Sequence, residues 1–130
     1  MADIKISDLS IGDWVRHTFY EENLQIKRID GERERLLVEK GLMSVSCHLD
    51  HFEPIPLTPE ILEKNGLCVV EEDADFCEYE LFGSENFSIF HTKGTVHYRL
   101  ETPQASVVCW NVHQLQHALR LAGVEKEVEI

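Results

Sequence analysis

The sequence predicts an α+β protein with an N-terminal SH3-like or curled antiparallel β subdomain, a linking helix, and an antiparallel sheet with one packed C-terminal helix. Three observations predict it. Short alternating segments separated by turn signals fill the first 57 residues, a capped helical segment follows, and the period of two then returns until a helical period begins near Asn111. We expect subdomains at residues 1–57 and 58–130, or one continuous domain, since 130 residues suit either.

The first subdomain is expected to contain four or five short strands. The segments that alternate are WVRHTFY (14–20), LQIKRI (24–29), RLLVEK (35–40) and LMSVSCHL (42–49). In the first of them, Val15, His17 and Phe19 would share one face, with Trp14 and Tyr20 on the other. Residues 53–57 contain two prolines, which favours an edge strand or a connector there.

The linking helix is expected over residues 59–65. Thr58 stands where an N-cap belongs, Pro59 suits the first helical position, and Gly66 follows the end. Ile61 and Leu62 would then pack inward.

The second subdomain is expected to be a meander followed by a helix. The alternating segments are 67–72, 76–82, 86–92, 95–101 and 106–110, and residues 124–130 alternate as a short closing strand. Asn111 suits an N-cap with Gln114 as its capping-box partner, and Gly123 ends the helix. The apolar stripe of this helix is expected to consist of Val112, Leu115, Leu119 and Ala122.

Composition excludes several classes of function. No apolar run approaches the roughly 18 residues of a membrane span, so we expect a cytoplasmic protein that is not associated with a membrane. The net charge of −12 repels phosphate backbones, which argues against direct nucleic-acid binding. The four cysteines form no CxxC pair, which argues against a zinc ribbon or a redox motif. We expect all four to be reduced. Those in apolar segments, Cys109 among them, are expected to be buried thiols.

Two groups of residues raise the question of a metal site. His113 and His117 lie four residues apart on the predicted helix, but Gln114 stands where the HExxH motif has its glutamate, and Arg120 lies on the flank of His117. Cys47, His48 and His51 are also close in sequence, although strand alternation separates the first two. We therefore expect no resident metal and no cofactor, and we interpret the two helical histidines as surface neighbours.

Three blocks resemble a known family: LSIGDWV near the start, EPIPLTPEILEKNG in the middle and VHQLQHAL near the end. Together they are similar to a family of small uncharacterised proteins of gut-type anaerobic bacteria and their phages or mobile elements, with an IG(N/D)WV, EPIPLT and VHQLQ pattern. The resemblance spans the chain and implies a phage-related accessory role, but no catalytic residue. His117 departs from the family's pattern.

No GxSxG, GxGxxG or Walker motif occurs, which favours a non-catalytic function. The candidate binding residues are Trp14, Tyr20, His113, Gln114 and His117; for Trp14 and Tyr20 packing in the core is the favoured alternative. The acidic run at 71–80 predicts a solvated turn or a docking patch for a basic partner.

The leading hypothesis is an accessory or protein-interaction module of phage or mobile-element origin. One alternative is a metal-binding protein or metal-dependent enzyme that uses His113 and His117, and another is an acidic DNA mimic that inhibits a basic protein. The partner's identity and the oligomeric state do not follow from the sequence.

Overall fold

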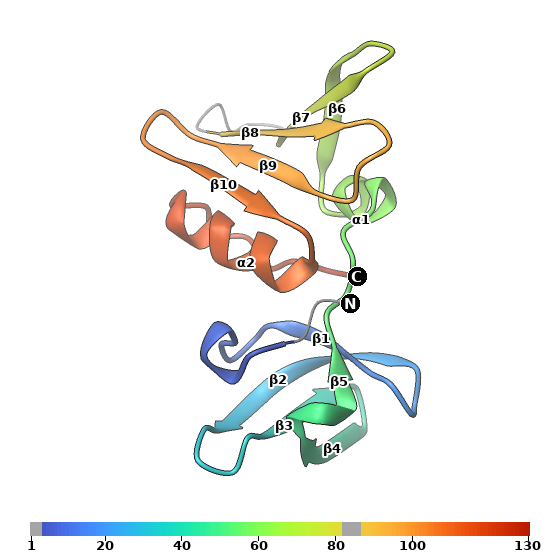
Figure 1. The fold of residues 1–130 in the computed structure, drawn as a ribbon, viewed down its shortest axis with the longest axis vertical. Helices are drawn as coiled ribbons and strands as arrows, with labels where there is room; N and C mark the ends of the chain where they lie inside the picture. Colours follow the sequence, from blue (N-terminus) through green and yellow to red (C-terminus); the bar gives the residue numbers. More distant parts are fainter. Residues whose placement is uncertain (1–3, 82–86) are drawn as a thin grey trace. The chain divides into compact units, whose positions relative to one another are not determined.

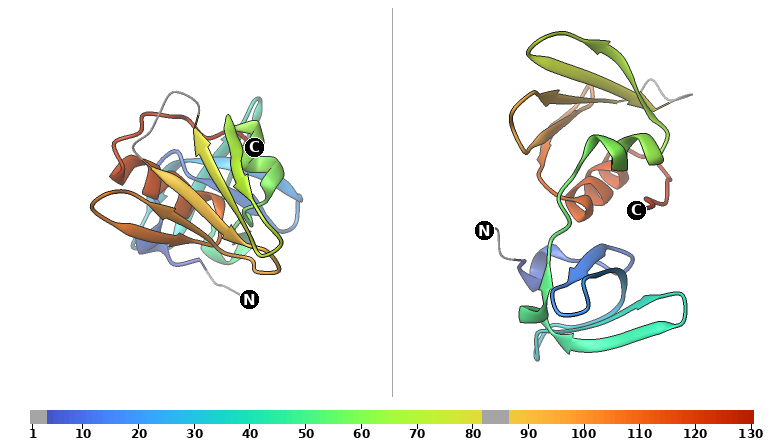
Figure 2. Two further views of the ribbon diagram at one scale, coloured as in Figure 1. Left: turned by 90° about the horizontal axis from the view of Figure 1, so that it is seen from above. Right: turned by 90° about the vertical axis from the view of Figure 1, so that its right-hand side faces the viewer.

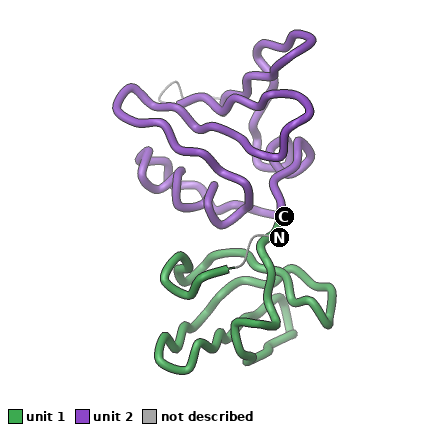
Figure 3. Tube along the Cα trace, viewed as in Figure 1, with its two compact units in different colours: residues 1–55 green, residues 56–130 purple. Residues whose placement is uncertain are grey.

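The computed structural model describes residues 4–81 and 87–130, and the chain divides into two compact units, residues 1–55 and 56–130 (Figure 3). Each unit contains a five-stranded antiparallel sheet, and both α-helices belong to the second (Figure 1). The predicted α+β class, with a curled N-terminal sheet and a C-terminal helix, is confirmed. No helix in the described ranges is long and apolar enough to cross a membrane.

The sheet of the first unit has the strand order β4-β3-β2-β1-β5. Its strands are β1 (Trp14–His17), β2 (Glu22–Asp30), β3 (Arg35–Lys40), β4 (Met43–His48) and β5 (Phe52–Glu53). A 3₁₀ turn, Leu49–His51, joins β4 to β5, and β5 pairs with the free side of β1, so the last strand returns to the first. The sheet encloses a core of buried apolar side chains: Leu9, Val15, Leu24, Ile26, Leu36, Val38, Leu49 and Phe52.

The first predicted strand, residues 14–20, is wrong at its C-terminal end. β1 stops at His17, because Nδ1 of this residue accepts hydrogen bonds from the backbone N–H groups of Phe19 and Tyr20. Those two groups are therefore turned toward a side chain and not toward a neighbouring strand. Phe19 does not share the buried face of Val15, and its side chain is 79% exposed.

A second histidine ends β4 in the same manner. The predicted strand 42–49 stops at His48, whose Nδ1 accepts a hydrogen bond from the N–H of Asp50 at 3.2 Å and caps the 3₁₀ turn. In both places a histidine side chain replaces the next ladder bond and turns the chain.

The second unit contains a meander with the strand order β10-β9-β8-β7-β6. Its elements are α1 (Pro59–Lys64), β6 (Leu67–Glu72), β7 (Phe76–Leu81), β8 (Ser88–Thr92), β9 (Tyr98–Glu101), β10 (Ser106–Cys109) and α2 (Val112–Leu121). Both helices lie on one face of the sheet (Figures 1 and 2). Residues 82–86, which include the end of the expected strand 76–82 and the start of the expected strand 86–92, lie outside the described residues.

Both predicted helix caps are confirmed. Oγ1 of Thr58 accepts a hydrogen bond from the N–H of Ile61 at 3.3 Å, and Oδ1 of Asn111 accepts one from Gln114 at 3.1 Å. Oε1 of Gln114 reaches back to the N–H of Trp110 at 2.7 Å, one residue before the cap. The N–H groups of Ile61 and Gln114 are among those that the first turn of a helix leaves without partners, and these contacts satisfy them.

The closing strand predicted at 124–130 is wrong, since no strand forms there. The segment is held instead by the side-chain amide of Asn65, which binds both backbone groups of Glu129, and by the burial of Val128. A side chain thus takes the place of a neighbouring strand.

Candidate functional site

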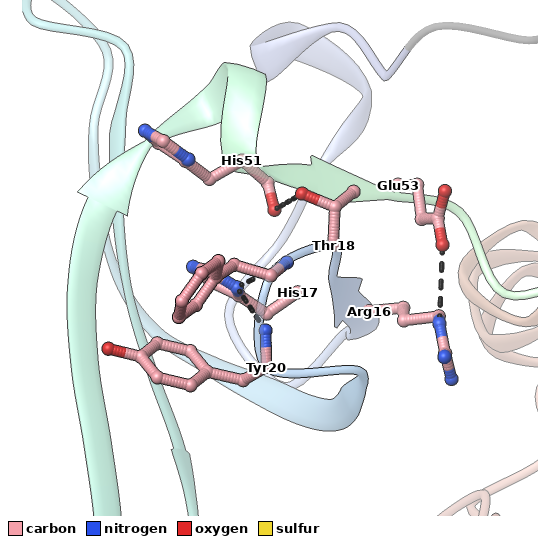
Figure 4. Close-up of polar contacts among 7 residues, drawn as sticks. Arg16, His17, Thr18, Tyr20, His51 and Glu53 are labelled. Atoms are coloured by element: carbon pink, nitrogen blue, oxygen red, sulfur yellow. Dashed lines mark hydrogen bonds and ion pairs between the residues drawn. The ribbon is translucent and has the colours of Figure 1, made fainter.

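The candidate site is formed by the turn between β1 and β2 and the 3₁₀ turn before β5. The backbone N–H of Thr18 donates a hydrogen bond to the carbonyl oxygen of His51 at 2.9 Å, and Oγ1 of Thr18 donates to the same oxygen at 3.2 Å. Figure 4 shows this connection beside His17. The two turns are therefore fixed to one another.

His17 lies at the centre of the site and is only 2% exposed. Its Nδ1 accepts from the N–H groups of Phe19 and Tyr20, both at 3.2 Å (Figure 4). Because Nδ1 is an acceptor, the proton of the neutral ring is on Nε2. Nε2 is buried and has no hydrogen-bond partner among the residues that the structure describes.

Three rings surround the imidazole of His17. The ring of Tyr20 lies 4.6 Å away between centroids, and that of Phe52 lies 5.2 Å away in an edge-on arrangement. The imidazole of His51 is nearly parallel to it, with the centroids 5.8 Å apart and an interplanar angle of 7°. These neighbours provide an apolar surrounding that disfavours a charged imidazole.

Burial lowers the pKa of His17 below its ordinary value of 6.5, and the nearby His51 lowers it further. Both causes act against the protonated ring. His17 is therefore neutral at pH 7, as its acceptor role at Nδ1 requires.

An exposed aromatic pair lies on this support. Phe19 is 79% exposed and Tyr20 is 48% exposed, and their rings meet edge to face with centroids 5.1 Å apart. The next residue, Glu21, has φ +53°, a left-handed conformation that costs a non-glycine residue of order 1 kcal/mol, and its N–H donates to the carbonyl oxygen of His17 at 2.9 Å. The turn is thus held in one conformation that presents two aromatic rings to solvent.

Each of the two turns carries an exposed acidic side chain. Glu21 follows Tyr20 in the chain and is exposed, and the side chain of Asp50, which precedes His51, is 88% exposed. Two cations of the same unit are engaged in ion pairs, Arg16 with Glu53 at 3.2 Å and Lys40 with Glu22 at 3.6 Å.

Trp14 and Tyr20 were predicted to share the outer face of one strand, and the structure does not bring them together in this way. Trp14 begins β1 and is half-buried, whereas Tyr20 has left the strand. Packing in the core, the alternative favoured for these residues, is wrong for Tyr20. His17, Phe19 and His51 were not predicted as site residues, because a histidine that accepts backbone hydrogen bonds is not among the usual turn signals.

The predicted residues His113, Gln114 and His117 lie on α2 in the second unit. The surface interpretation is wrong for His113, which is 5% exposed, whereas His117 is half-buried, and their ring centroids are 6.0 Å apart. Gln114 serves the helix cap. The buried stripe includes His113 and Ala118 in place of the half-exposed Ala122, because the start of α2 is more deeply packed than its end.

The described residues contain no group of three or more His, Cys, Asp and Glu side chains arranged to hold a metal ion. Nε2 of His48 faces Glu34 at 3.7 Å and its Nδ1 faces Asp50, while His51 stacks on His17. Cys47, His48 and His51 therefore do not converge.

The acidic run at 71–80 covers the end of β6, a turn at residues 73–75 and most of β7, so the predicted turn is confined to three residues. Oδ1 of Asp73 accepts from the N–H groups of Asp75 and Phe76, which lowers the pKa of that carboxyl. Sγ of Cys77 donates to Glu72 at 2.9 Å, and this bond, followed by Lys93, lowers the pKa of Glu72.

All four cysteines are free thiols: Cys47, Cys68, Cys77 and Cys109. Burial, above all other causes, raises the pKa of Cys77, and it raises that of Cys109 to about 12. Neither of these two buried thiols is an activated nucleophile, since the thiolate is the reactive form. Comparison with protein-family models, with curated proteins and with solved structures finds no match to this chain.

Proposed function

We propose that the protein is a non-catalytic protein-interaction module that contacts its partner through Phe19 and Tyr20. The observation that carries the proposal is the exposure of two edge-to-face aromatic rings on a turn with a fixed backbone. Large aromatic side chains supply much of the binding free energy at protein interfaces, especially tyrosine and tryptophan.

The fixed backbone supports this proposal. The turn is held by the two hydrogen bonds to Nδ1 of His17 and by the contacts of Thr18 with His51. A contact surface that is ordered before binding loses less conformational entropy when the partner arrives.

The flanking charges favour a partner segment that combines basic and apolar side chains. Glu21 and Asp50 offer exposed carboxylates in the two turns of the site, and the whole chain carries a net charge of −12. An arginine or lysine of the partner would lie over the face of Tyr20 and near these carboxylates. Long-range attraction would also speed association with a basic partner.

The resemblance of the LSIGDWV, EPIPLT and VHQLQ blocks to proteins of anaerobic bacteria and their phages supports an accessory role in a phage or mobile element, exerted in the cytoplasm. In that setting the module would dock onto a basic protein of the element or of its host.

The test is a comparison of three variants of the full chain: Phe19→Ala, Tyr20→Ala and Leu42→Ala. Leu42 is the matched control, because it is a fully exposed apolar residue in another turn of the same unit. A protein captured from the organism that encodes the chain is purified, and its Kd for each variant is measured. Loss of one anchor weakens binding by about 2 kcal/mol, or roughly 30-fold, and Leu42→Ala leaves the Kd unchanged. Equal affinities for all three variants and the wild type contradict the proposal.

A further inference from the structure

We propose that His17 is a proton-operated latch, which holds the β1–β2 turn closed while Nδ1 is unprotonated and releases Phe19 and Tyr20 when Nδ1 takes up a proton. The effect on partner binding rests on the function proposed above. The opening of the turn does not, and it is measured without a partner.

The geometry at Nδ1 carries the inference. One lone pair accepts two backbone N–H groups, from Phe19 and Tyr20, both at 3.2 Å. A proton on Nδ1 occupies this lone pair and makes the ring a donor at both nitrogens. Both hydrogen bonds are then lost together, and two N–H dipoles face a positive charge.

The second proton must bind at Nδ1. In the closed turn Nε2 already carries the proton of the neutral ring, because Nδ1 accepts. Protonation and the closed turn therefore exclude each other. A histidine with a solvent-exposed Nδ1 would titrate without any such consequence.

The surroundings provide no compensation for an imidazolium in the closed state. His17 is 2% exposed, and Nε2 has no hydrogen-bond partner among the described residues. The ring of His17 lies against His51 of the 3₁₀ turn, a second titratable ring, and against Phe52 of β5. A buried charge without a partner is costly, so the protonated ring is stable only after it reaches water.

Two carboxylates on the strands that pair with β1 have cations of their own. Glu22 of β2 lies across from His17 in the strand register and pairs with Lys40, and Glu53 of β5 follows Phe52 and pairs with Arg16. In the turn itself, Glu21 is exposed to solvent. These carboxylates therefore do not stabilise a protonated His17 in the closed turn, and protonation of His17 favours opening.

The lowered pKa of His17, caused first by burial and then by His51, agrees with this coupling. Because one proton is taken up on opening, the ratio of open to closed turn rises up to tenfold for each unit by which the pH falls below the ordinary imidazole value. The contact surface would be intact at neutral pH and lost in acid.

The first experiment is a pH titration of the isotope-labelled full chain by NMR, from pH 8 to pH 5. It follows the ring nitrogens of His17 and the protection factors of the Phe19 and Tyr20 amides, with the Ile26 amide of the core as a reference. We expect the two turn amides to lose up to tenfold protection per pH unit in step with His17 protonation, while Ile26 stays protected. Turn amides that remain protected while His17 becomes charged overturn the proposal.

Two variants sharpen the result. In His17→Asn, the side-chain oxygen can still accept from the N–H groups of Phe19 and Tyr20, but the side chain does not titrate. The protection factors of these two amides should therefore be independent of pH. In His51→Gln, the latch remains and opens at a higher pH, because one like charge is removed. Should His17→Asn fail to fold, the titrations of the wild type and of His51→Gln still decide.

The binding arm uses the captured partner at pH 7.5 and pH 5.5. We expect the wild type, but not His17→Asn, to lose affinity at the lower pH, by at most about tenfold. If the Phe19→Ala and Tyr20→Ala variants bind as well as the wild type, the proposed function fails, and the NMR titration still accepts or rejects the latch.

Discussion

Asn65 and Glu129 are 64 positions apart, and the side-chain amide of the first binds the backbone of the second like a neighbouring strand. Nδ2 of Asn65 donates to the carbonyl oxygen of Glu129 at 2.7 Å, and Oδ1 accepts from the N–H of Glu129 at 2.7 Å. The same Nδ2 donates to the carbonyl oxygen of Ile61 in α1. One amide group thus connects α1, which precedes the sheet, to the last residues of the chain.

Asn65→Ala should destabilise the second unit by about 2 kcal/mol, because it removes three hydrogen bonds at a buried position. Urea unfolding in a Trp14→Phe background measures this, since Trp110 is then the only tryptophan and belongs to that unit. Glu129→Ala is the control, because only the backbone of Glu129 takes part in these bonds, and it should leave the midpoint unchanged. An unchanged midpoint in Asn65→Ala would show that the tail contributes nothing.

The stability of the first unit should fall as the pH drops below about 6.5, the ordinary value for an imidazole. The folded-state pKa of His17 is depressed, so the unfolded chain binds more protons in the window beneath 6.5, and acid favours unfolding there. Urea unfolding followed by Trp14 fluorescence, in a Trp110→Phe background, should show this decline between pH 7 and pH 5. His17→Asn should have a flatter profile. Parallel profiles for the two proteins would remove His17 as the cause.

Much of the fold could be predicted from the sequence, because local signals and tertiary packing agree. The segments RLLVEK and LCVVEE become β3 and β6 with the predicted bounds, and each is limited by turn residues on both sides. The starts of both helices could be predicted because the side chains of Thr58 and Asn111 accept hydrogen bonds from N–H groups only three residues away.

The differences arise where a side chain interacts in a way that no pattern of apolar residues encodes. Alternation continues through residues 14–20, but the two hydrogen bonds at His17 end the strand. The segment 124–130 also alternates, yet Asn65 holds it from the far end of the unit. The candidate site depends on the hydrogen bonds of His17, which no apolar pattern indicates. Of its residues, only Tyr20 was therefore predicted.

Helix α2 should depend on its cap. Asn111→Ala removes the acceptor of the Gln114 N–H and should destabilise the second unit by about 1 kcal/mol. Asn111→Asp, which keeps the oxygen and adds a negative charge at the positive end of the helix, should retain the stability. The difference between the two variants is measured by urea unfolding, and equal losses would mean that Asn111 acts by packing and not as a cap.

The four thiols should react with an alkylating reagent in an order set by their burial. Cys68 is exposed and should be modified first at pH 7.5, whereas Cys109, 1% exposed and with its pKa raised to about 12, should stay unmodified until the unit unfolds. Cys77 should resemble Cys109, because burial and its hydrogen bond to Glu72 keep the thiol protonated. Mass spectrometry of peptides over time gives the rate at each site. Cys68→Ala should abolish the fast phase. When urea is added to this variant, the remaining three cysteines should react at similar rates. Rapid labelling of Cys109 in the folded protein would show that the second unit opens far more often than its packing implies.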